Sequence, residues 1–171
     1  MNDAGNCIVQ GNEAATQWGA INDNARRYKQ QWRISFTGAS LAQVFLLAQW
    51  LDSFRLKISA ELEYDDMGGG YRGVNLTVTG ATPLKGAAVP ADLLEEDGTY
   101  CDDEGCLWVE QVLEENTAEI YSAFVGEESY DDVEFNIQRS AIARMLASGK
   151  PIDGIEAFKA LIPKSAWLLN L

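Results

Sequence analysis

The strongest constraint on the fold is a run of alternating residues in the first half of the 171-residue chain. From Leu56 to Tyr64 every second residue is apolar and the residues between are polar, and the alternation repeats from Val74 to Val78. A period of two is typical of a strand with one buried face. The glycine-rich segment 65–73 can supply the turn. The sequence therefore predicts an antiparallel hairpin over residues 56–79.

Apolar residues at helical spacing surround this hairpin. They predict five helices, at residues 14–28, 40–51, 109–124, 140–149 and 153–162. Alternation predicts two further strands, at residues 32–36 and 133–137. We therefore expect an α+β fold in which a small, mainly antiparallel sheet of about four strands is covered by about five helices. The length predicts a single globular domain over residues 1–171.

The apolar segments are short. The longest, Val44–Ala48, has five residues, whereas a helix needs about 20 to cross a bilayer. No export signal is recognisable at the start of the chain. The three cysteines are an odd number and too few for a disulfide framework. These features predict a cytoplasmic protein that does not bind membranes.

Charge is distributed very unevenly. The net charge is −13, but residues 61–135 hold 20 acidic and 2 basic residues, and the flanking segments are slightly basic. No Lys or Arg lies between Lys85 and Arg139. On the predicted third helix, Glu110 and Glu114 form a like-charge pair at i,i+4, which costs roughly 0.2–0.5 kcal/mol in an isolated helix. A basic partner would relieve this repulsion, although acidic residues also form ordinary solvated surfaces.

The candidate partner-binding residues are acids from the hairpin turn, the loop after it, the predicted third helix and the segment that follows that helix. They are Asp65, Asp66, Glu95, Glu96, Asp97, Asp102, Asp103, Glu104, Glu110, Glu114, Glu127, Glu128, Asp131 and Asp132. Tyr100, Trp108, Tyr121 and Tyr130 lie among them and could supply the aromatic anchors that interfaces use.

Rows of carboxylates can occupy a groove that evolved for phosphates. We therefore expect a binding or inhibitory protein that docks on the basic, nucleic-acid-binding surface of a partner protein. A phage or plasmid counter-defence inhibitor of the anti-CRISPR or anti-restriction type, acting as a DNA mimic, is the most concrete form of this hypothesis. An immunity or antitoxin protein that neutralises a cationic toxin is the alternative. Direct binding of nucleic acid is disfavoured by the charge.

Catalysis is the third hypothesis. The chain has no histidine, which removes the commonest general base and the Ser-His and Cys-His nucleophile pairs. Glu61 and Glu63 share one strand face and could form a carboxylate-dependent site, but an exposed hairpin face is the better explanation. Cys101 and Cys106 lack the second ligand pair of a zinc site. We therefore expect no catalytic residues, no metal and no cofactor.

Overall fold

The computed structural model describes residues 3–126 and 129–166, with side chains described from residue 18 onward. Internal contacts group the chain into two units, Met1–Trp32 and Arg33–Leu171. The expectation of a single domain stays a prediction. In the part of the chain that is described, no helix combines the length and apolar character that a membrane span requires.

The first element is one long helix, α1 (Asp3–Leu47). The strand predicted at residues 32–36 and the helix start predicted at residue 40 are wrong, because both lie inside this helix. The Ser40 hydroxyl donates to the carbonyl of Phe36, one turn earlier, instead of capping a helix. Ile34, Leu41 and Phe45 are buried at helical spacing, so the helical period continues through the short alternating stretch.

Within the first unit, the apolar stripe predicted for residues 14–28 lies on α1. Its described large members, Trp18, Ile21 and Tyr28, are each more than half exposed. Inside this unit the stripe therefore faces solvent. The basic residues Arg26 and Arg27 lie on the same helix and are also exposed.

The C-terminal end of α1 is held by a single arginine. Arg139, the first residue of α4 (Arg139–Ala147), donates to the carbonyl oxygens of Phe45 at 2.8 Å, Ala48 at 2.5 Å and Leu51 at 2.6 Å. Its guanidinium also lies over the Phe45 ring, 5.3 Å from the centroid. The last carbonyls of a helix have no partner within it, so this cation completes the hydrogen bonding of α1 and joins it to α4.

The sheet has three antiparallel strands in the order β2-β1-β3. They are β1 (Leu51–Tyr64), β2 (Gly70–Pro83) and β3 (Val133–Gln138). The predicted hairpin is confirmed and is longer than expected, and the strand predicted at 133–137 is confirmed. In the hairpin turn, the Asp65 carboxylate accepts hydrogen bonds from the amides of Met67 and Gly69 at 2.9 and 2.7 Å. Gly68 adopts a φ of 80°, which favours glycine.

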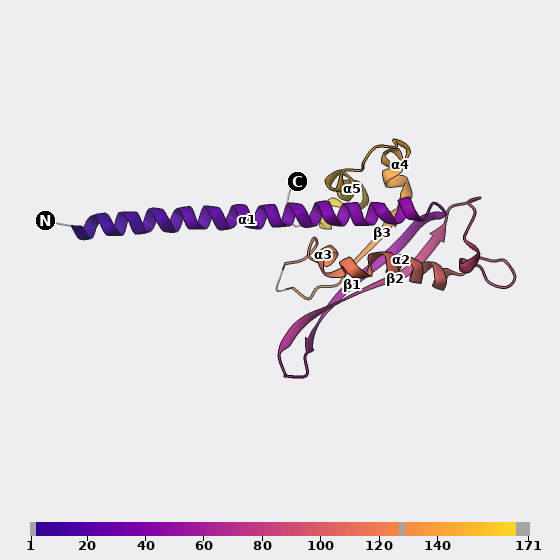
Figure 1. Ribbon diagram of the computed structural model, residues 1–171, viewed down its shortest axis with the longest axis horizontal. Helices are drawn as coiled ribbons and strands as arrows, with labels where there is room; N and C mark the ends of the chain where they lie inside the picture. Colours follow the sequence, from indigo (N-terminus) through magenta and orange to yellow (C-terminus); the bar gives the residue numbers. More distant parts are fainter. Residues whose placement is uncertain (1–2, 127–128, 167–171) are drawn as a thin grey trace. The chain divides into compact units, whose positions relative to one another are not determined.

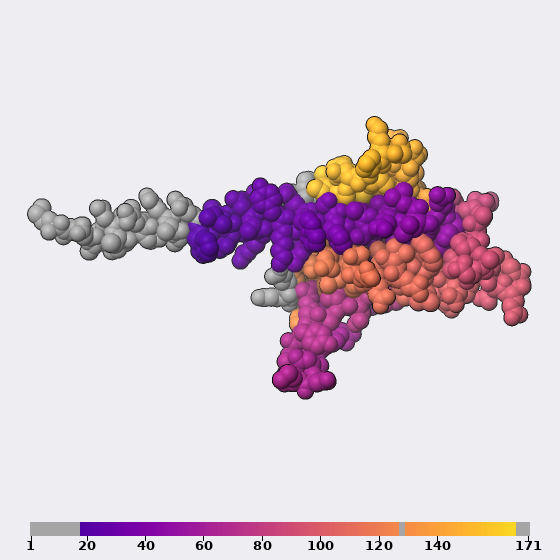
Figure 2. Space-filling view, viewed as in Figure 1, coloured from indigo at the N-terminus to yellow at the C-terminus, as the bar shows by residue number. Residues whose placement is uncertain are grey.

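Strand β3 is much shorter than the hairpin. It pairs with β1 only from Ser53 to Ile58, so residues 59–75 form a ribbon of two strands. We call these residues the hairpin arm. Figure 1 shows the two strands continuing beyond β3, and in the space-filling view their tip protrudes (Figure 2).

The predicted third helix is divided into three pieces. They are α2 (Asp102–Leu113), a 3-10 turn (Glu114–Asn116) and α3 (Thr117–Tyr121). At the junction the Thr117 hydroxyl donates to the carbonyl of Glu114. The helices predicted near 140–149 and 153–162 are confirmed as α4 and α5 (Gly154–Leu161). Short 3-10 turns occur at Ala91–Leu93 and Lys164–Ala166.

Helices cover one face of the sheet and leave the other open. Leu56 and Ile58 of β1 and Ile137 of β3 are completely buried on the covered face. The Phe124 ring, after α3, packs on Phe135 of β3 with ring centroids 4.5 Å apart. The open face carries charged residues of β1 and β3. The fold is therefore α+β, with helices on one face of a three-stranded antiparallel sheet.

A close contact joins α1 and α5 inside the second unit. A Cβ atom built on Gly154 would overlap the carbonyl of Ser35, and one built on Gly38 would overlap the carbonyl of Gly154. Both positions therefore require glycine, because the two helices touch through their backbones. The Asp153 side chain caps α5 by accepting from the amide of Glu156 at 3.0 Å.

Candidate partner-binding surface

Strand β2 is an edge strand, and α2 packs beside it. Two acids of α2 reach its backbone: Glu110 accepts a hydrogen bond from the Val78 amide at 2.7 Å, and Asp102 accepts one from the Ala81 amide at 2.8 Å. The Tyr100 hydroxyl donates to the Ala81 carbonyl at 2.7 Å. Unpaired backbone groups on an edge strand invite pairing with other chains. Asp102 and Glu110 therefore stabilise the edge of the sheet, and their carboxylates are less available to a partner protein.

Asp132 also has a counter-charge within the chain. Its carboxylate lies 3.1 Å from the Lys57 amine, and Glu134 lies 3.9 Å from Arg55, both on the open face of the sheet. These side chains are about half exposed, so each pair contributes little to stability. Part of the acidity is thus neutralised internally.

Asp131 lies in a segment that is tied to the hairpin. The Arg72 guanidinium of β2 sits over the Tyr121 ring, 4.5 Å from its centroid, and 5.8 Å from the Tyr130 ring. It also donates to the Gly126 carbonyl at 3.3 Å. The Asp131 carboxylate accepts from the Ser129 hydroxyl at 2.6 Å and stays exposed. Glu127 and Glu128 lie outside the described residues.

The loop before α2 presents Glu95, Glu96 and Asp97 on an exposed turn. The Glu95 amide donates to the Thr99 carbonyl, and the Gly98 amide donates to the Glu95 carbonyl, which closes this turn. Gly98 has a φ of 80°. The Thr99 hydroxyl donates to Asp97 at 2.6 Å, and this hydrogen bond holds the pKa of the Asp97 carboxyl below its usual value. The three acids are therefore held on a rigid turn and face solvent.

Asp103 and Glu104 occupy the first turn of α2, where the helix dipole favours negative charge. Both are exposed. In the described part of the chain, no Lys or Arg pairs with either of them, or with Glu95, Glu96 or Glu114. Among the described residues, these five acids therefore have no ion-pair partner.

The acids follow β2 from one end to the other. Asp102 bonds to Ala81, Glu110 bonds to Val78, and Glu114 lines a groove with Leu76. Asp65 and Asp66 are exposed in the turn at the far end of the same strand. At about 3.3 Å per residue, β2 extends roughly 36 Å from Ala81 to Gly70. Residues that are far apart in the sequence are thus brought along one sheet edge, which we call the β2 edge.

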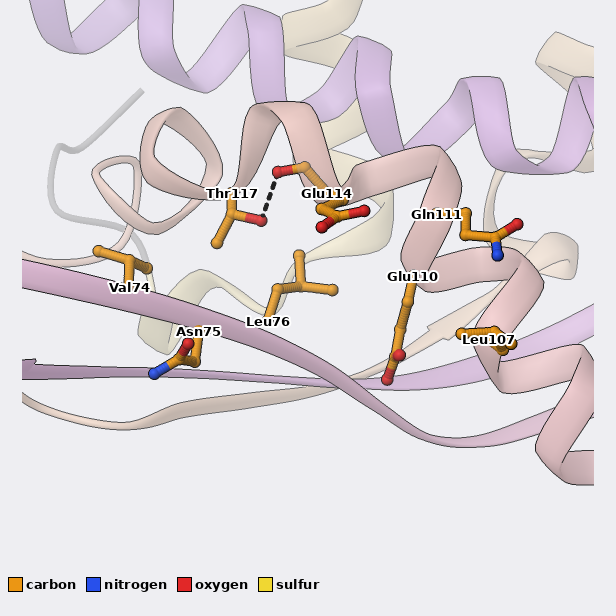
Figure 3. A pocket seen from close by; sticks show the side chains of 8 residues that line it. All are labelled: Val74, Asn75, Leu76, Leu107, Glu110, Gln111, Glu114 and Thr117. Atoms are coloured by element: carbon orange, nitrogen blue, oxygen red, sulfur yellow. Dashed lines mark hydrogen bonds between the residues drawn. The ribbon is translucent and has the colours of Figure 1, made fainter.

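A groove of about 320 Å³ lies along the β2 edge between the strand and α2. Figure 3 shows Glu110 extending from α2 toward the strand, and Leu76 pointing from the strand toward the helical segment. The other residues that line the groove are Val74, Asn75, Leu107, Gln111, Glu114 and Thr117. The groove therefore combines apolar walls, two carboxylates and an open stretch of strand.

The aromatic residues expected as anchors are mostly engaged in the core. Tyr121 is completely buried, and the rings of Tyr100 and Trp108 pack against Trp50 at 5.8 and 5.9 Å. Of the four, only Tyr130 is exposed, at 46%. Burial therefore excludes Tyr121 as an interface anchor, and Tyr100 and Trp108 expose only part of their side chains to a partner.

The hairpin arm carries apolar residues that the sequence did not single out. Leu62, Tyr64, Met67 and Tyr71 are 52%, 67%, 96% and 50% exposed. The Tyr71 hydroxyl donates to the Glu63 carboxylate at 2.7 Å, which raises the pKa of Tyr71. Leu62 and Tyr64 continue the alternation of the buried face, but the arm reaches beyond the helices that bury this face elsewhere. The alternation alone does not show how far the covering helices extend.

Cys101 precedes α2, and Cys106 lies within it. Cys101 and Cys106 carry free thiols. Burial raises the pKa of Cys106 to about 11, and a hydrogen bond with Glu95 raises that of Cys101. Protonated thiols are weak nucleophiles. Within residues 3–126 and 129–166, no cluster of three or more Cys, Asp or Glu residues is arranged to hold a metal ion.

Comparison with protein-family models, with curated proteins and with solved structures finds no match. The function is therefore inferred from the residues of the chain alone.

Proposed function

We propose that this chain is an acidic binding protein that docks on a basic, nucleic-acid-binding surface of a partner protein and blocks it. The observation that carries this proposal is the β2 edge, which has exposed acids near both ends, Asp65 and Asp66 at the turn and Glu95, Glu96, Asp103 and Glu104 near Asp102, with roughly 36 Å of strand between them. Duplex DNA presents charges at regular spacing along its axis, and an extended row of carboxylates suits the same kind of groove.

The unpaired acids supply attraction and orientation. Glu95, Glu96, Asp103 and Glu104 all lie near the Asp102 end of the β2 edge, in the loop and first helical turn. Such a concentration of one sign of charge accelerates encounter with a basic surface and makes binding sensitive to salt. Relief of the repulsion among these acids adds to the gain on binding.

The hairpin arm supplies apolar contact. Its exposed residues Tyr64 and Met67 lie beside Asp65 and Asp66. Apolar or aromatic anchors surrounded by charged residues are the usual composition of an interface hot spot. The arm and the acids near Asp102 would thus form two contact regions at opposite ends of one strand.

The more specific form of the proposal is a counter-defence inhibitor of the anti-CRISPR or anti-restriction type that mimics DNA. The free thiols of Cys101 and Cys106 agree with action in the cytoplasm. In this form the chain and duplex DNA compete for one surface of the partner.

The test is affinity capture with defined competitors. The full chain is immobilised, a lysate of the source organism is passed over it, and captured proteins are identified after elution with salt or with duplex DNA. We expect basic nucleic-acid-binding proteins that elute with DNA and that are lost when Glu95 and Glu96 are both changed to Lys. A captured protein that DNA does not displace would favour the antitoxin alternative.

A matched control separates the surface from net charge. Changing Asn22, Asp23 and Asn24 together to Lys alters the net charge by the same four units at exposed positions of α1. We expect this variant to retain capture. Equal loss in both variants would show that binding is generic and would contradict the proposal.

A further inference from the structure

The hydrogen-bond pattern of the hairpin defines which backbone groups of β2 point outward. At the turn, the Asp65 amide bonds to the Gly69 carbonyl, and the Val78 amide bonds to Glu110, away from β1. The register between these points is regular, with Ile58 opposite Leu76. Because bonding and non-bonding pairs alternate in an antiparallel ladder, the amide and carbonyl groups of Leu76 and Val74 also point away from β1.

The β2 edge therefore has a closed half and an open half. Glu110, Asp102 and Tyr100 occupy the outward groups at Val78 and Ala81. At Leu76 and Val74, no described side chain bonds to the outward groups, and both residues line the groove between β2 and α2. Natural proteins close sheet edges that must not pair, so an open stretch next to a closed one needs an explanation.

We propose that an extended segment of the partner protein adds to the sheet at Val74 and Leu76 and places a Lys or Arg side chain against Glu114. This mode of docking rests on the function proposed above. Main-chain hydrogen bonds to the edge provide affinity, and alternate side chains of the added strand provide specificity. Neighbouring strands lie about 4.8 Å apart, so an added strand would lie next to Val74 and Leu76, which line the same groove as Glu114.

The groove matches a basic side chain and not a neutral or acidic one. Glu114 lines it without a basic partner, and Glu110 contributes a second carboxylate. Leu107 and Leu76 provide apolar walls for the methylene stem of Lys or Arg. The bond between Glu110 and Val78 marks where pairing must end, which gives the added strand a fixed register.

The test uses a defined probe, the acetylated and amidated pentapeptide Val-Lys-Val-Lys-Val. It is titrated at low salt into the full chain labelled with nitrogen-15. We expect the largest amide shifts at Val74 and Leu76, together with slower hydrogen exchange there. The same peptide N-methylated at its valines cannot donate to the edge from those residues, and we expect it to bind at least about tenfold more weakly, equivalent to about 1.4 kcal/mol.

Two neighbouring glutamates give a matched pair of variants. Glu114 lines the groove and Glu115 does not, and both are exposed. We expect Glu114→Lys to weaken peptide binding about tenfold or more and Glu115→Lys to leave it within about twofold, with unchanged thermal unfolding in both.

The outcomes distinguish the two proposals. If both peptides bind equally and the shifts fall on Glu95–Asp97 or the first turn of α2, strand addition is wrong, but binding of a basic ligand is retained. Absence of binding by the peptide also overturns strand addition, and the capture experiment then decides the proposed function separately. Equal effects of the two glutamate variants would reduce the groove to a generic charged surface and overturn the inference.

Discussion

Replacing Glu110 by alanine tests whether this carboxylate stabilises the fold or serves only as a surface charge. In a chain of net charge −13, removal of a carboxylate should relieve repulsion, and loss of the like-charge pair with Glu114 gains roughly 0.2–0.5 kcal/mol. Against this, Glu110 accepts a 2.7 Å hydrogen bond from the Val78 amide. A hydrogen bond to a charged group contributes roughly 1.5–3 kcal/mol, so the bond outweighs the repulsion.

We therefore expect Glu110→Ala to lower the free energy of unfolding by about 1–2 kcal/mol, because water in the groove replaces part of the bond. In urea denaturation, with a slope of about 2 kcal/mol per molar, the midpoint should fall by roughly 0.5–1 M. Hydrogen exchange at Val78 should accelerate. Glu114, one turn later, makes no such bond, so Glu114→Ala should leave the free energy of unfolding unchanged or raise it slightly. If both variants change the midpoint equally, or Glu110→Ala raises it, the assignment of Glu110 to the scaffold is wrong.

Three further predictions concern the scaffold and the thiols. Arg139→Leu should lower the free energy of unfolding, measured in urea, by more than about 3 kcal/mol, because three carbonyls lose a charged donor. Arg144 is exposed, so Arg144→Leu should lower it by less than about 0.5 kcal/mol. Similar losses in the two variants would disprove the capping role of Arg139. Gly154→Ala should destabilise by about 2–4 kcal/mol in the same assay, whereas Gly19→Ala, which has open space around it, should stabilise by roughly 0.5–1 kcal/mol. Cys106, with a pKa of about 11, should be alkylated by iodoacetamide about a hundredfold more slowly at pH 8 than an unperturbed thiol. Its rate should keep rising with pH toward 11 in peptide-resolved mass spectrometry, and a plateau near pH 9 would contradict this.

Local patterns in the sequence determined most of the sheet and the C-terminal helices. The alternation from Leu56 to Tyr64 is long enough to exclude a helix, and Asp153 and Gly149 limit the last helices. The five residues from Trp32 to Phe36 were too few to distinguish a strand from a helix. The same apolar residues also fit a helix that is buried at Ile34, Leu41 and Phe45. A longer window would have favoured the helix.

The candidate site was harder to predict, because a carboxylate looks the same in the sequence whether it bonds to the backbone or faces a partner. Asp102 and Asp103 are neighbours and both are exposed, yet only Asp102 bonds to the Ala81 amide. Only the packing of α2 on β2 separates them. The exposed Tyr64 was missed for a related reason, since its place in the alternation indicates burial and the covering helices do not extend that far.

The mismatch in length between β3 and the hairpin has a mechanical consequence. Ribbons of two strands twist more than wider sheets and are only marginally stable alone, so stiffness should decrease along the arm from Ile58 toward Asp65. Amide exchange should follow this gradient while the centre of the sheet remains protected. The arm can then bend at little cost to the core, and under the docking proposed above it would adapt to partner surfaces of different curvature.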